Sequence, residues 1–279
     1  MRLISICPSN TELVAYLGLT EHLVGVDDFS DWPKQVKQLP RLGPDLSIRI
    51  DDVEALEPEL VLASLSVPGM ERNVEELQKR GIPHVVYNPN SLADIRHNFL
   101  DLGKRTNCQL KAQQVINAYD NFLNTYKEHS SGIDPVSLYW EWWPKPVFTP
   151  GQQNWLTEIS QLAGGQNIYA HTNKASIQTD WNDVYNHNPD HICLAWVGIQ
   201  TEKIKADLLW KRPNWNKLQA LQENQVHILE EDLYCRPSPR LLLGLKKLAA
   251  ILHPNHMPAN DGIDPLLSFI SEKERGWLN

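Results

Sequence analysis

The stretch VEALEPELVLAS, residues 53–64, joins a short helical pattern to a proline-led turn and an apolar run. The same pattern returns 131 residues later as VYNHNPDHICLA, residues 184–195. A short apolar run behind such a turn is typical of a buried strand. A segment that repeats at this distance predicts two lobes of related topology within one chain.

Further apolar runs extend this pattern along the chain and indicate its fold class. They alternate with amphipathic segments of helical length, which is the pattern of βα units with largely parallel sheets. A chain of 279 residues is long enough for two such lobes. We therefore predict an α/β fold with two Rossmann-like lobes. The strands are expected at Arg2–Ile6, Leu23–Val26, Leu60–Ala63, His84–Tyr87, Val136–Trp140, His191–Trp196 and Val226–Leu229.

The longest helical pattern lies between the two series of strands, from Asn107 to His129. It contains no glycine or proline, and Ser130-Ser131-Gly132 follows as the expected helix end. About 22 residues at a rise of 1.5 Å give a helix of roughly 33 Å, the diameter of a small domain. This helix is either a stiff strut between lobes, which we favour, or a long surface helix of one domain. Its apolar face is expected from Leu110, Val115, Ile116, Tyr119, Leu123 and Tyr126.

These patterns divide the chain into four parts. The expected boundaries are 1–106 for an N-terminal α/β lobe, 107–129 for the connecting backbone helix, 130–253 for a C-terminal α/β lobe and 254–279 for a C-terminal extension. The opening apolar run ends at Pro8 and is too short for the apolar region of a signal peptide. We therefore expect either a cytoplasmic protein or a periplasmic one from which a signal was removed.

Composition and charge narrow the classes of function. The net charge of −8 argues against a nucleic-acid binder, because such proteins need clustered Lys and Arg. Ten tryptophans suit a protein that holds a large, partly apolar ligand, although each single one is expected in the core. The chain has no CxxC spacing, and its HxxxH spacing, His187 to His191, contains Pro189 and is not taken as a metal site. Cys7 and Cys193 are expected as buried thiols because they lie in apolar runs.

Sequence motifs for catalysis are absent. The chain has no nucleophile elbow, phosphate-binding loop, zinc-protease motif or dinucleotide-binding glycine pattern. We therefore expect no enzyme activity, no metal site and no intrinsic cofactor. Ser9–Glu12 is interpreted as a helix N-terminal cap and Gly164-Gly165 as a helix stop. Glu141, between two aromatic pairs, is expected at a strand position that faces water or ligand amides.

Five segments in a fixed order carry a resemblance to a known family. They are RLISICPSNTELVAYLGLTEHLVGVDDFSDWP (2–33), LPRLG (39–43), VEALEPELVLAS (53–64), GGQNIY (164–169) and RPSPRLLLGLKKLAAIL (236–252). Together they resemble the helical-backbone (class III) substrate-binding proteins of ABC transporters, which serve cobalamin, haem and ferric siderophores, and most closely the cobalamin-binding members. The resemblance covers residues 1–253. It implies two α/β lobes bridged by one rigid helix, a ligand cleft between the lobes, and a monomer that delivers a metal chelate to an ABC permease.

The resemblance also implies ligand-binding residues. In the cobalamin-binding members an acidic residue precedes the SPR segment, and the matching residue here is Asp232. Aromatic residues surround the corrin there, which is a wide, largely apolar plate fringed by amides. The matching aromatic positions are Trp32, Trp142, Trp143, Phe148 and Trp196. One tryptophan of those members has no counterpart, because residues 63–66 read Ala-Ser-Leu-Ser.

Two glutamates occupy equivalent places in the two expected lobes. Glu71 and Glu202 are separated by the same 131 positions as the repeated segment, and each is expected in the first turn of the helix after a buried strand. An acidic residue in a first helical turn also has a local explanation, because it complements the helix dipole. The resemblance implies that both lie at the outer tips of the lobes and dock into arginine pockets of the permease.

The leading hypothesis is capture of a cobalamin-like corrinoid and its delivery to an ABC importer. The alternative within the same fold is a ferric siderophore or haem receptor, favoured if Arg, Lys and Tyr line the site, because anionic chelates need positive charge. A cytosolic corrinoid-handling protein without a transporter is a further alternative. An α/β enzyme of similar topology would require clustered cysteine or histidine ligands, which the sequence lacks.

Overall fold

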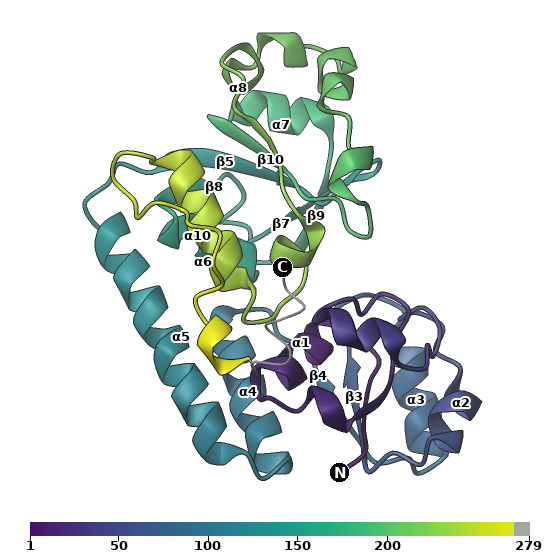
Figure 1. Cartoon of the computed structure of the whole chain (residues 1–279). Coiled ribbons are helices and arrows are strands. Elements are labelled where there is room, and N and C mark those ends of the chain that lie inside the picture. Colours follow the sequence, from purple (N-terminus) through teal and green to yellow (C-terminus); the bar gives the residue numbers. More distant parts are fainter. Residues whose placement is uncertain (271–279) are drawn as a thin grey trace. The chain divides into compact units, whose positions relative to one another are not determined.

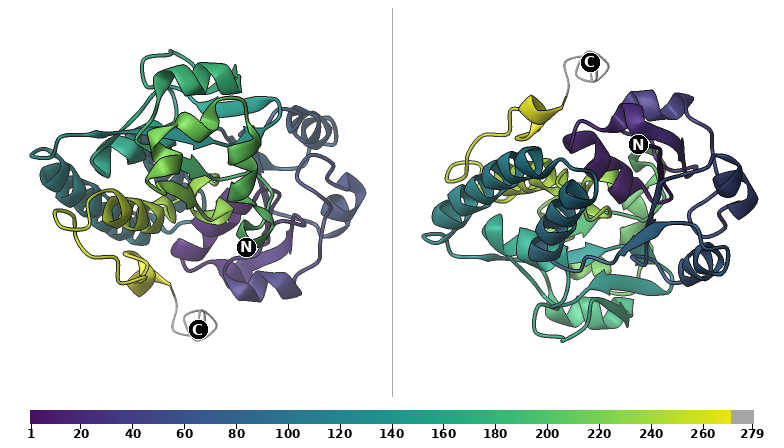
Figure 2. Two further views of the ribbon diagram at one scale, coloured as in Figure 1. Left: turned by 90° about the horizontal axis from the view of Figure 1, so that it is seen from above. Right: turned by 90° about the horizontal axis from the view of Figure 1, so that it is seen from below.

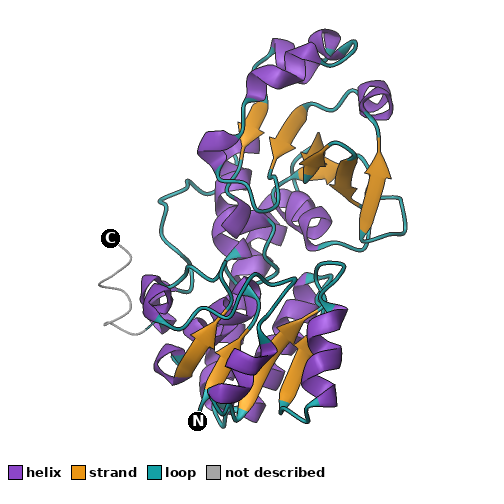
Figure 3. Ribbon diagram, turned by 90° about the vertical axis from the view of Figure 1, so that its right-hand side faces the viewer, coloured by secondary structure: helices purple, strands orange, loops and turns teal. Residues whose placement is uncertain are grey.

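The computed structural model describes residues 1–270, and residues 271–279 lie outside this description. The chain forms two compact units (Figure 1). Unit 1 comprises Met1–Asp120 together with the C-terminal segment from Pro265, and unit 2 comprises Asn121–Asp264. Each unit combines a parallel sheet with helices, as Figure 3 shows. The predicted α/β class with two lobes is therefore confirmed.

Unit 1 is built on a four-stranded parallel sheet with the strand order β2-β1-β3-β4. Its strands are β1 (Leu3–Ser5), β2 (Leu23–Val26), β3 (Leu60–Ser64) and β4 (His84–Tyr87). Its helices are α1 (Pro8–Tyr16), α2 (Ile50–Ala55), α3 (Glu71–Lys79) and α4 (Leu92–Arg105), with 3-10 turns η1 (Thr20–His22), η2 (Lys34–Gln38) and η6 (Leu267–Phe269). The pair α1 and α4 lies on one face of the sheet and the pair α2 and α3 on the other (Figure 1). All four strands predicted for this lobe are confirmed.

The sheet of unit 1 is covered by helices on both faces, as its mostly apolar strands require. All five residues of β3 are buried, which a strand achieves only when helices pack on both sides of it. One face packs around Ile4, Val53, Val61 and Leu77, contributed by β1, α2, β3 and α3. The apolar runs in the sequence therefore indicated both the strands and their burial.

Helix α1 begins earlier than the sequence suggested. Its N-cap is Cys7, whose side chain caps no backbone N–H, and Pro8 occupies the first helical position. Proline suits that position because the N–H it lacks would be unpaired there. Ser9–Glu12 therefore lie inside the helix, and the prediction that they form its cap is wrong. Thr11 instead donates a hydrogen bond to Ser5 Oγ at 2.8 Å, which ties the helix to β1.

Unit 2 contains two sheets. A parallel sheet has the order β11-β10-β5-β8, and an antiparallel sheet has the order β6-β7-β9. The parallel strands are β5 (Val136–Glu141), β8 (Gly165–Asn167), β10 (His191–Leu194) and β11 (Val226–Ile228). The antiparallel strands are β6 (Trp143–Pro144), β7 (Val147–Pro150) and β9 (Ser176–Thr179). The predicted strands at β5, β10 and β11 are confirmed, whereas β8 and the antiparallel sheet were not predicted.

Short helices and 3-10 turns make up most of the rest of unit 2. The helices are α6 (Trp155–Leu162), α7 (Trp181–His187), α8 (Gln219–Gln222), α9 (Glu231–Tyr234) and α10 (Leu241–Leu252), and the turns are η3 (Thr201–Lys203), η4 (Ala206–Lys211) and η5 (Trp215–Lys217). Helix α6 stops at the predicted glycine pair, where Gly164 has a φ of +79°. Asp180 caps α7 by accepting from the backbone N–H groups of Asn182 and Asp183, each at 2.9 Å.

The repeated sequence segment takes the same form in both units. In unit 1 it runs from α2 into β3, and in unit 2 it runs from α7 into β10. Both strands are interior members of a parallel sheet, and every residue in them is buried. The prediction of a short helix, a turn and a buried strand is confirmed at both places.

The predicted long helix is α5 (Gln109–Ser130), which has 22 residues and ends at the expected Ser130. Its buried face includes Ala112, Val115, Ile116, Tyr119 and Tyr126. Leu110 is 85% exposed, so its assignment to the buried face was wrong. The boundary between the two units falls inside α5, after Asp120. A role for α5 as a rigid strut stays a prediction.

The C-terminal segment, drawn in yellow in Figure 2, is an extended loop that ends in the turn η6. From Pro265 onward it belongs to unit 1, where Leu266 and Ile270 are buried. The Lys111 ammonium lies 5.0 Å from the centre of the Phe269 ring, a cation–π arrangement. The last described residues of the chain are thus packed on the N-terminal unit.

Candidate functional site

The residues predicted to bind ligand or transporter are distributed over both units. Trp32 and Glu71 belong to unit 1. The others belong to unit 2 and are Trp142, Trp143, Phe148, Trp196, Glu202 and Asp232. Five of the six ligand candidates therefore lie in unit 2, where their mutual arrangement can be described.

A hairpin at the end of β5 brings three of the aromatic candidates together. Trp143 in β6 is the cross-strand partner of Phe148 in β7, and side chains so placed contact one another. The Trp142 backbone N–H donates to the carbonyl of Phe148 at 2.9 Å. Trp143 is 40% exposed, whereas Trp142 packs on Trp155 with ring centres 6.1 Å apart. Trp143 is thus the most exposed of the three rings, and Phe148 is its cross-strand neighbour.

Trp196 lies beside this hairpin because its strand is the neighbour of β5. It follows β10, and backbone bonds hold both of its chain neighbours: Ala195 N donates to Glu141 O, and Val197 N donates to Trp142 O, each at 3.1 Å. The indole Nε1–H of Trp196 donates to Glu141 Oε1 at 3.1 Å. The backbone of Trp196 therefore lies next to the hairpin, and its role in ligand binding stays a prediction.

Glu141 has a different role from the one expected. Its side chain is fully buried, and it accepts two hydrogen bonds from Arg212, at 2.6 and 2.8 Å. Tyr139 donates a further bond to Glu141 Oε2 at 2.8 Å. Burial, reinforced by the neighbouring Glu141 carboxylate, holds the pKa of the Tyr139 phenol well above its usual value, so that this hydroxyl remains a donor. The prediction that Glu141 faces water or ligand amides is wrong, because Arg212 turns the carboxylate into the core.

Arg212 is itself enclosed by aromatic rings. Its guanidinium carbon lies 4.3 Å from the ring centre of Trp215 and 5.0 Å from that of Trp181. The indole of Trp215 donates to the carbonyl of Trp181 at 2.8 Å, and the indole of Trp181 donates to the carbonyl of Pro144 at 3.2 Å. Sequence reasoning missed Arg212 and Trp181, and the available signal was the run KRPNW at residues 211–215.

A pocket of about 430 Å³ adjoins this aromatic cluster, because Trp181 belongs to both. Its walls are the turn between β6 and β7, the start of α7 and the chain after η4. The lining residues are Pro144, Lys145, Pro146, Val147, Thr179, Asp180, Trp181, Asn182 and Pro213. None of the predicted ligand residues is among them, although Pro144 and Val147 of the same hairpin are.

Asp232 is paired with a cation of its own unit. Its Oδ2 lies 2.9 Å from Arg240 Nη2, and the side chain of Asp232 is 34% exposed. The neighbouring Glu231 pairs with Arg236 at 3.2 Å. Arg212 pairs with Glu141, so each of the three arginines in unit 2 has a carboxylate partner. The guanidinium groups of this unit are therefore charge-balanced.

In unit 1, Trp32 lies at the end of a loop that a buried carboxylate holds in place. Asp27 Oδ1 accepts from the backbone N–H groups of Phe29 and Ser30, at 2.8 and 3.0 Å. Arg41 donates to the carbonyls of Asp27 and Ser30 at 2.8 and 2.6 Å. Burial raises the pKa of Asp27 to about 6. These hydrogen bonds fix the conformation of the loop that carries Trp32. The ring centre of Trp32 lies 5.1 Å from that of Tyr16.

The two predicted docking glutamates are both exposed but lie in different local structures. Glu71 is the first residue of α3 and accepts from the backbone N–H of Gly69 at 2.7 Å, as expected for an acidic residue at a helix start. Glu202 lies in the three-residue turn η3, where Thr201 donates to it at 3.1 Å. The expectation of a helix around Glu202 was wrong, because residues 201–217 form three 3-10 turns instead.

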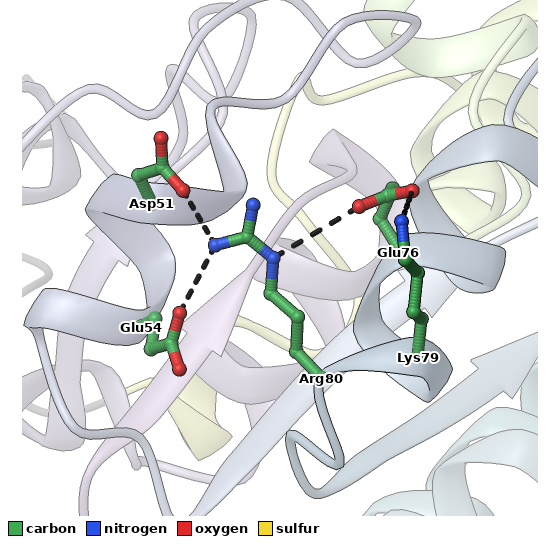
Figure 4. A network of polar contacts seen from close by, with 5 residues as sticks. All are labelled: Asp51, Glu54, Glu76, Lys79 and Arg80. Carbon is green, nitrogen blue, oxygen red and sulfur yellow. Dashed lines mark hydrogen bonds and ion pairs between the residues drawn. The ribbon is translucent and has the colours of Figure 1, made fainter.

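Ion pairs centred on Arg80 link the C-terminal end of α3 to α2 (Figure 4). Arg80, which follows α3, reaches Asp51 at 2.5 Å and Glu54 at 3.0 Å, both in α2. Within its own helix it lies 3.9 Å from Glu76. Surface pairs of this kind contribute little one by one, but a shared arginine links the two helices at several points.

Two further features of the described part of the chain concern metals and membranes. Among residues 1–270, no group of three or more His, Cys, Asp or Glu side chains is placed to hold a metal ion. Cys7 and Cys193 are buried free thiols, as predicted. No helix in this range is both long and apolar enough to cross a bilayer.

Comparison with known families places the chain among proteins that bind solutes for transport. A family model described as "Periplasmic binding protein" matches residues 3–233, and the chain belongs to this family. The resemblance to the substrate-binding proteins of ABC transporters, inferred from sequence segments, is thereby confirmed. The match extends over strands and helices of both units.

Individual relatives agree with this assignment. The chain is 28% identical over 265 residues to the uncharacterized ABC transporter substrate-binding lipoprotein YvrC of Bacillus subtilis, covering 91% of this chain and 80% of that one. The periplasmic vitamin B12 binding protein BtuF of Vibrio cholerae is 25% identical with a TM-score of 0.76, covering 91% and 96%. A periplasmic heme binding protein from Pseudomonas aeruginosa has a TM-score of 0.81 at 21% identity, covering 92% and 94%, which shows the fold alone.

Proposed function

We propose that this protein captures a cobalamin-like corrinoid and delivers it to an ABC importer. The observation that carries the choice of ligand is the pairing of the arginines in unit 2. Each of its three arginines is paired with a carboxylate, while Trp143, Phe148 and Trp196 supply aromatic surface. A corrin plate fringed by neutral amides suits such a surface.

The same observation weighs against anionic chelates. Haem carries propionates and ferric siderophores carry anionic ligand groups, and both are best held by free guanidinium or ammonium groups. In unit 2 all three guanidinium groups already bind carboxylates, so the charge for such a chelate would have to come from lysines such as Lys145 at the pocket. The similarity to a vitamin B12 binding protein supports the same choice, whereas the haem-binding neighbour shares only the fold.

Delivery to a permease is supported by the family and by two exposed carboxylates. The relative in Bacillus subtilis is named as an ABC transporter substrate-binding lipoprotein, so an extracytoplasmic place is proposed for this chain as well. Glu71 and Glu202 are exposed, and we propose that each enters an arginine pocket of the permease. No catalytic step forms part of this function.

A competition experiment tests the ligand class. The purified protein is titrated with cyanocobalamin, haemin and a ferric hydroxamate siderophore while its tryptophan fluorescence is followed. We expect saturable quenching by cyanocobalamin that neither of the other chelates displaces at equal concentration. Displacement by haemin or the siderophore would establish the alternative receptor. Failure of all three to bind would contradict the function proposed here.

A further inference from the structure

The buried carboxylate of Glu141 is the centre of a closed hydrogen-bond arrangement in unit 2. It accepts two bonds from Arg212 and one each from Tyr139 and Trp196. A carboxylate offers about four acceptor positions, so these four donors satisfy it fully. The carboxylate therefore has no acceptor position left for water or ligand. Its role must lie in positioning the residues that donate to it.

The residue held at the edge of this arrangement is Trp196, which is half-buried. Its backbone is fixed on both sides by bonds to the carbonyls of Glu141 and Trp142. Only the side-chain torsions remain free, and the 3.1 Å bond from Nε1 to Glu141 constrains them. The orientation of the indole therefore depends on where the Glu141 carboxylate lies.

Arg212 determines that position. Its side chain is 5% exposed and forms both parallel bonds to the Glu141 carboxylate. The rings of Trp181 and Trp215 enclose its guanidinium. A planar, bidentate ion pair fixes direction as well as distance, which a single hydrogen bond does not.

We propose that the Glu141–Arg212 ion pair is a positioning device that holds the Trp196 indole in one orientation, so that the ring offers a fixed face to a flat ligand. The effect on ligand binding rests on the function proposed above. A ring that is already oriented loses little side-chain freedom when a ligand stacks on it. Glu141 and Arg212 are thus positioning residues that touch no ligand themselves.

If the Glu141–Arg212 pair served stability alone, its replacement by apolar side chains would leave the orientation of Trp196 unchanged. Replacing a buried ion pair with apolar side chains of similar volume is often neutral or favourable for stability, whereas removing one partner strands a buried charge. The paired replacement Glu141→Leu with Arg212→Met therefore separates folding from positioning. We expect this variant to fold and to lose the constraint on Trp196.

The first measurement needs no ligand. In spectra of protein with 15N-labelled tryptophan, the indole N–H of Trp196 is assigned by its loss in Trp196→Phe. We expect this N–H to exchange with solvent at least about tenfold faster in the paired variant than in the wild type, as loss of one buried hydrogen bond implies. An unchanged exchange rate overturns the proposal. Trp210→Phe, in the exposed part of η4, is the matched control and should leave the Trp196 signal in place.

The second measurement is a mutant cycle with cyanocobalamin as the probe. We expect Trp196→Phe and the paired variant each to weaken binding about tenfold, and the triple variant to bind no more weakly than either. Losses of binding free energy that add would mean that the ion pair does not act through Trp196.

If the paired variant does not fold, an unaltered affinity of Trp196→Phe overturns the proposal instead. If the wild type binds no cyanocobalamin, the proposed function fails, while the exchange experiment still decides the positioning role.

Discussion

At the scale of single residues, the pairing of Asp232 with Arg240 bears directly on ligand affinity. Asp232 is 34% exposed and retains acceptor capacity beyond its 2.9 Å contact with Arg240. We expect Asp232→Ala to weaken corrinoid binding by a few-fold to about a hundred-fold, the ~1–3 kcal/mol expected when a partly buried polar group loses its hydrogen-bond partner. Equilibrium titration measures this effect. Glu230→Ala, which removes a carboxylate from Lys247 instead, is the control and should leave affinity unchanged.

The Asp27 carboxyl predicts a specific dependence of stability on pH. Its pKa in the folded protein is about 6, above the ordinary 3.8, because burial favours the neutral form. The folded state then holds more protons than the unfolded state between these values, so stability is highest below about pH 4 and falls as pH rises to about 6. The difference amounts to roughly 3 kcal/mol.

Asn resembles the protonated acid in shape and hydrogen bonding, so Asp27→Asn should remove this dependence. Chemical denaturation of both proteins between pH 4 and pH 7 measures it. The free energy of unfolding of the wild type should decline relative to that of the variant as pH rises. Parallel curves would show that Asp27 ionises in the folded protein as it does in water.

The limits of sequence analysis are clearest at this scale. Trp142, Trp143 and Phe148 lie close together because they belong to one hairpin and the residue before it, while their role in ligand binding stays a prediction. Glu141 was placed wrongly because its partner is 71 residues away, and no local pattern indicates a pairing over that distance. The alternating pattern of a strand does not show that a glutamate such as Glu141 is buried when a distant arginine neutralises its charge.

At the scale of elements, two histidines on neighbouring strands link the stability of the unit 2 sheet to pH. His191 in β10 and His227 in β11 approach within 2.9 Å through Nδ1 and Nε2. Burial lowers the pKa of both, and the pKa of His227 falls to about 4, with His191 contributing. The unfolded chain therefore binds more protons between about pH 6.5 and pH 4, and stability falls as the solution is acidified through that range.

The variant His227→Gln removes one of the two groups and should reduce this acid sensitivity. Denaturation curves at pH 4.5 and pH 7 give the comparison, because the wild type should lose more free energy of unfolding than the variant. The trend is opposite in sign to that of Asp27, so the two groups are distinguished by their variants. An equal loss in both proteins would contradict the pairing of these rings.

Elements were predicted from sequence wherever they were long or strongly apolar. Strands β2 and β4 have the expected bounds, and α5 differs from its prediction by two residues at one end and one at the other. The antiparallel sheet escaped prediction because strands of two to four residues are too short to show a period of two. The turns η3 to η5 replaced an expected helix, and Pro213 lies within this segment.

At the scale of the whole molecule, the importer role depends on two exposed carboxylates in separate units. If both engage arginine pockets, the second contact forms at high effective concentration, so the pair together is worth more than either alone. We expect the double variant Glu71→Ala with Glu202→Ala to keep its corrinoid affinity and to lose delivery to the cognate permease in liposomes. Each single variant should lose only part of it.

The control for this experiment replaces two other exposed glutamates, one in each unit. Glu75→Ala with Glu223→Ala changes the net charge equally and should deliver ligand normally. Normal delivery by the Glu71 and Glu202 double variant would remove these residues from the docking surface. A wild-type protein that no permease recognises would instead favour a cytosolic corrinoid-handling role.

The central claim is that this chain binds a neutral, amide-fringed corrinoid, and calorimetric titration with cyanocobalamin tests it most directly. The aromatic hairpin, Trp196 and the balanced arginines of unit 2 predict saturable binding of one cyanocobalamin per chain. Absence of heat and of saturation with cyanocobalamin, together with saturable binding of haemin under the same conditions, would contradict it.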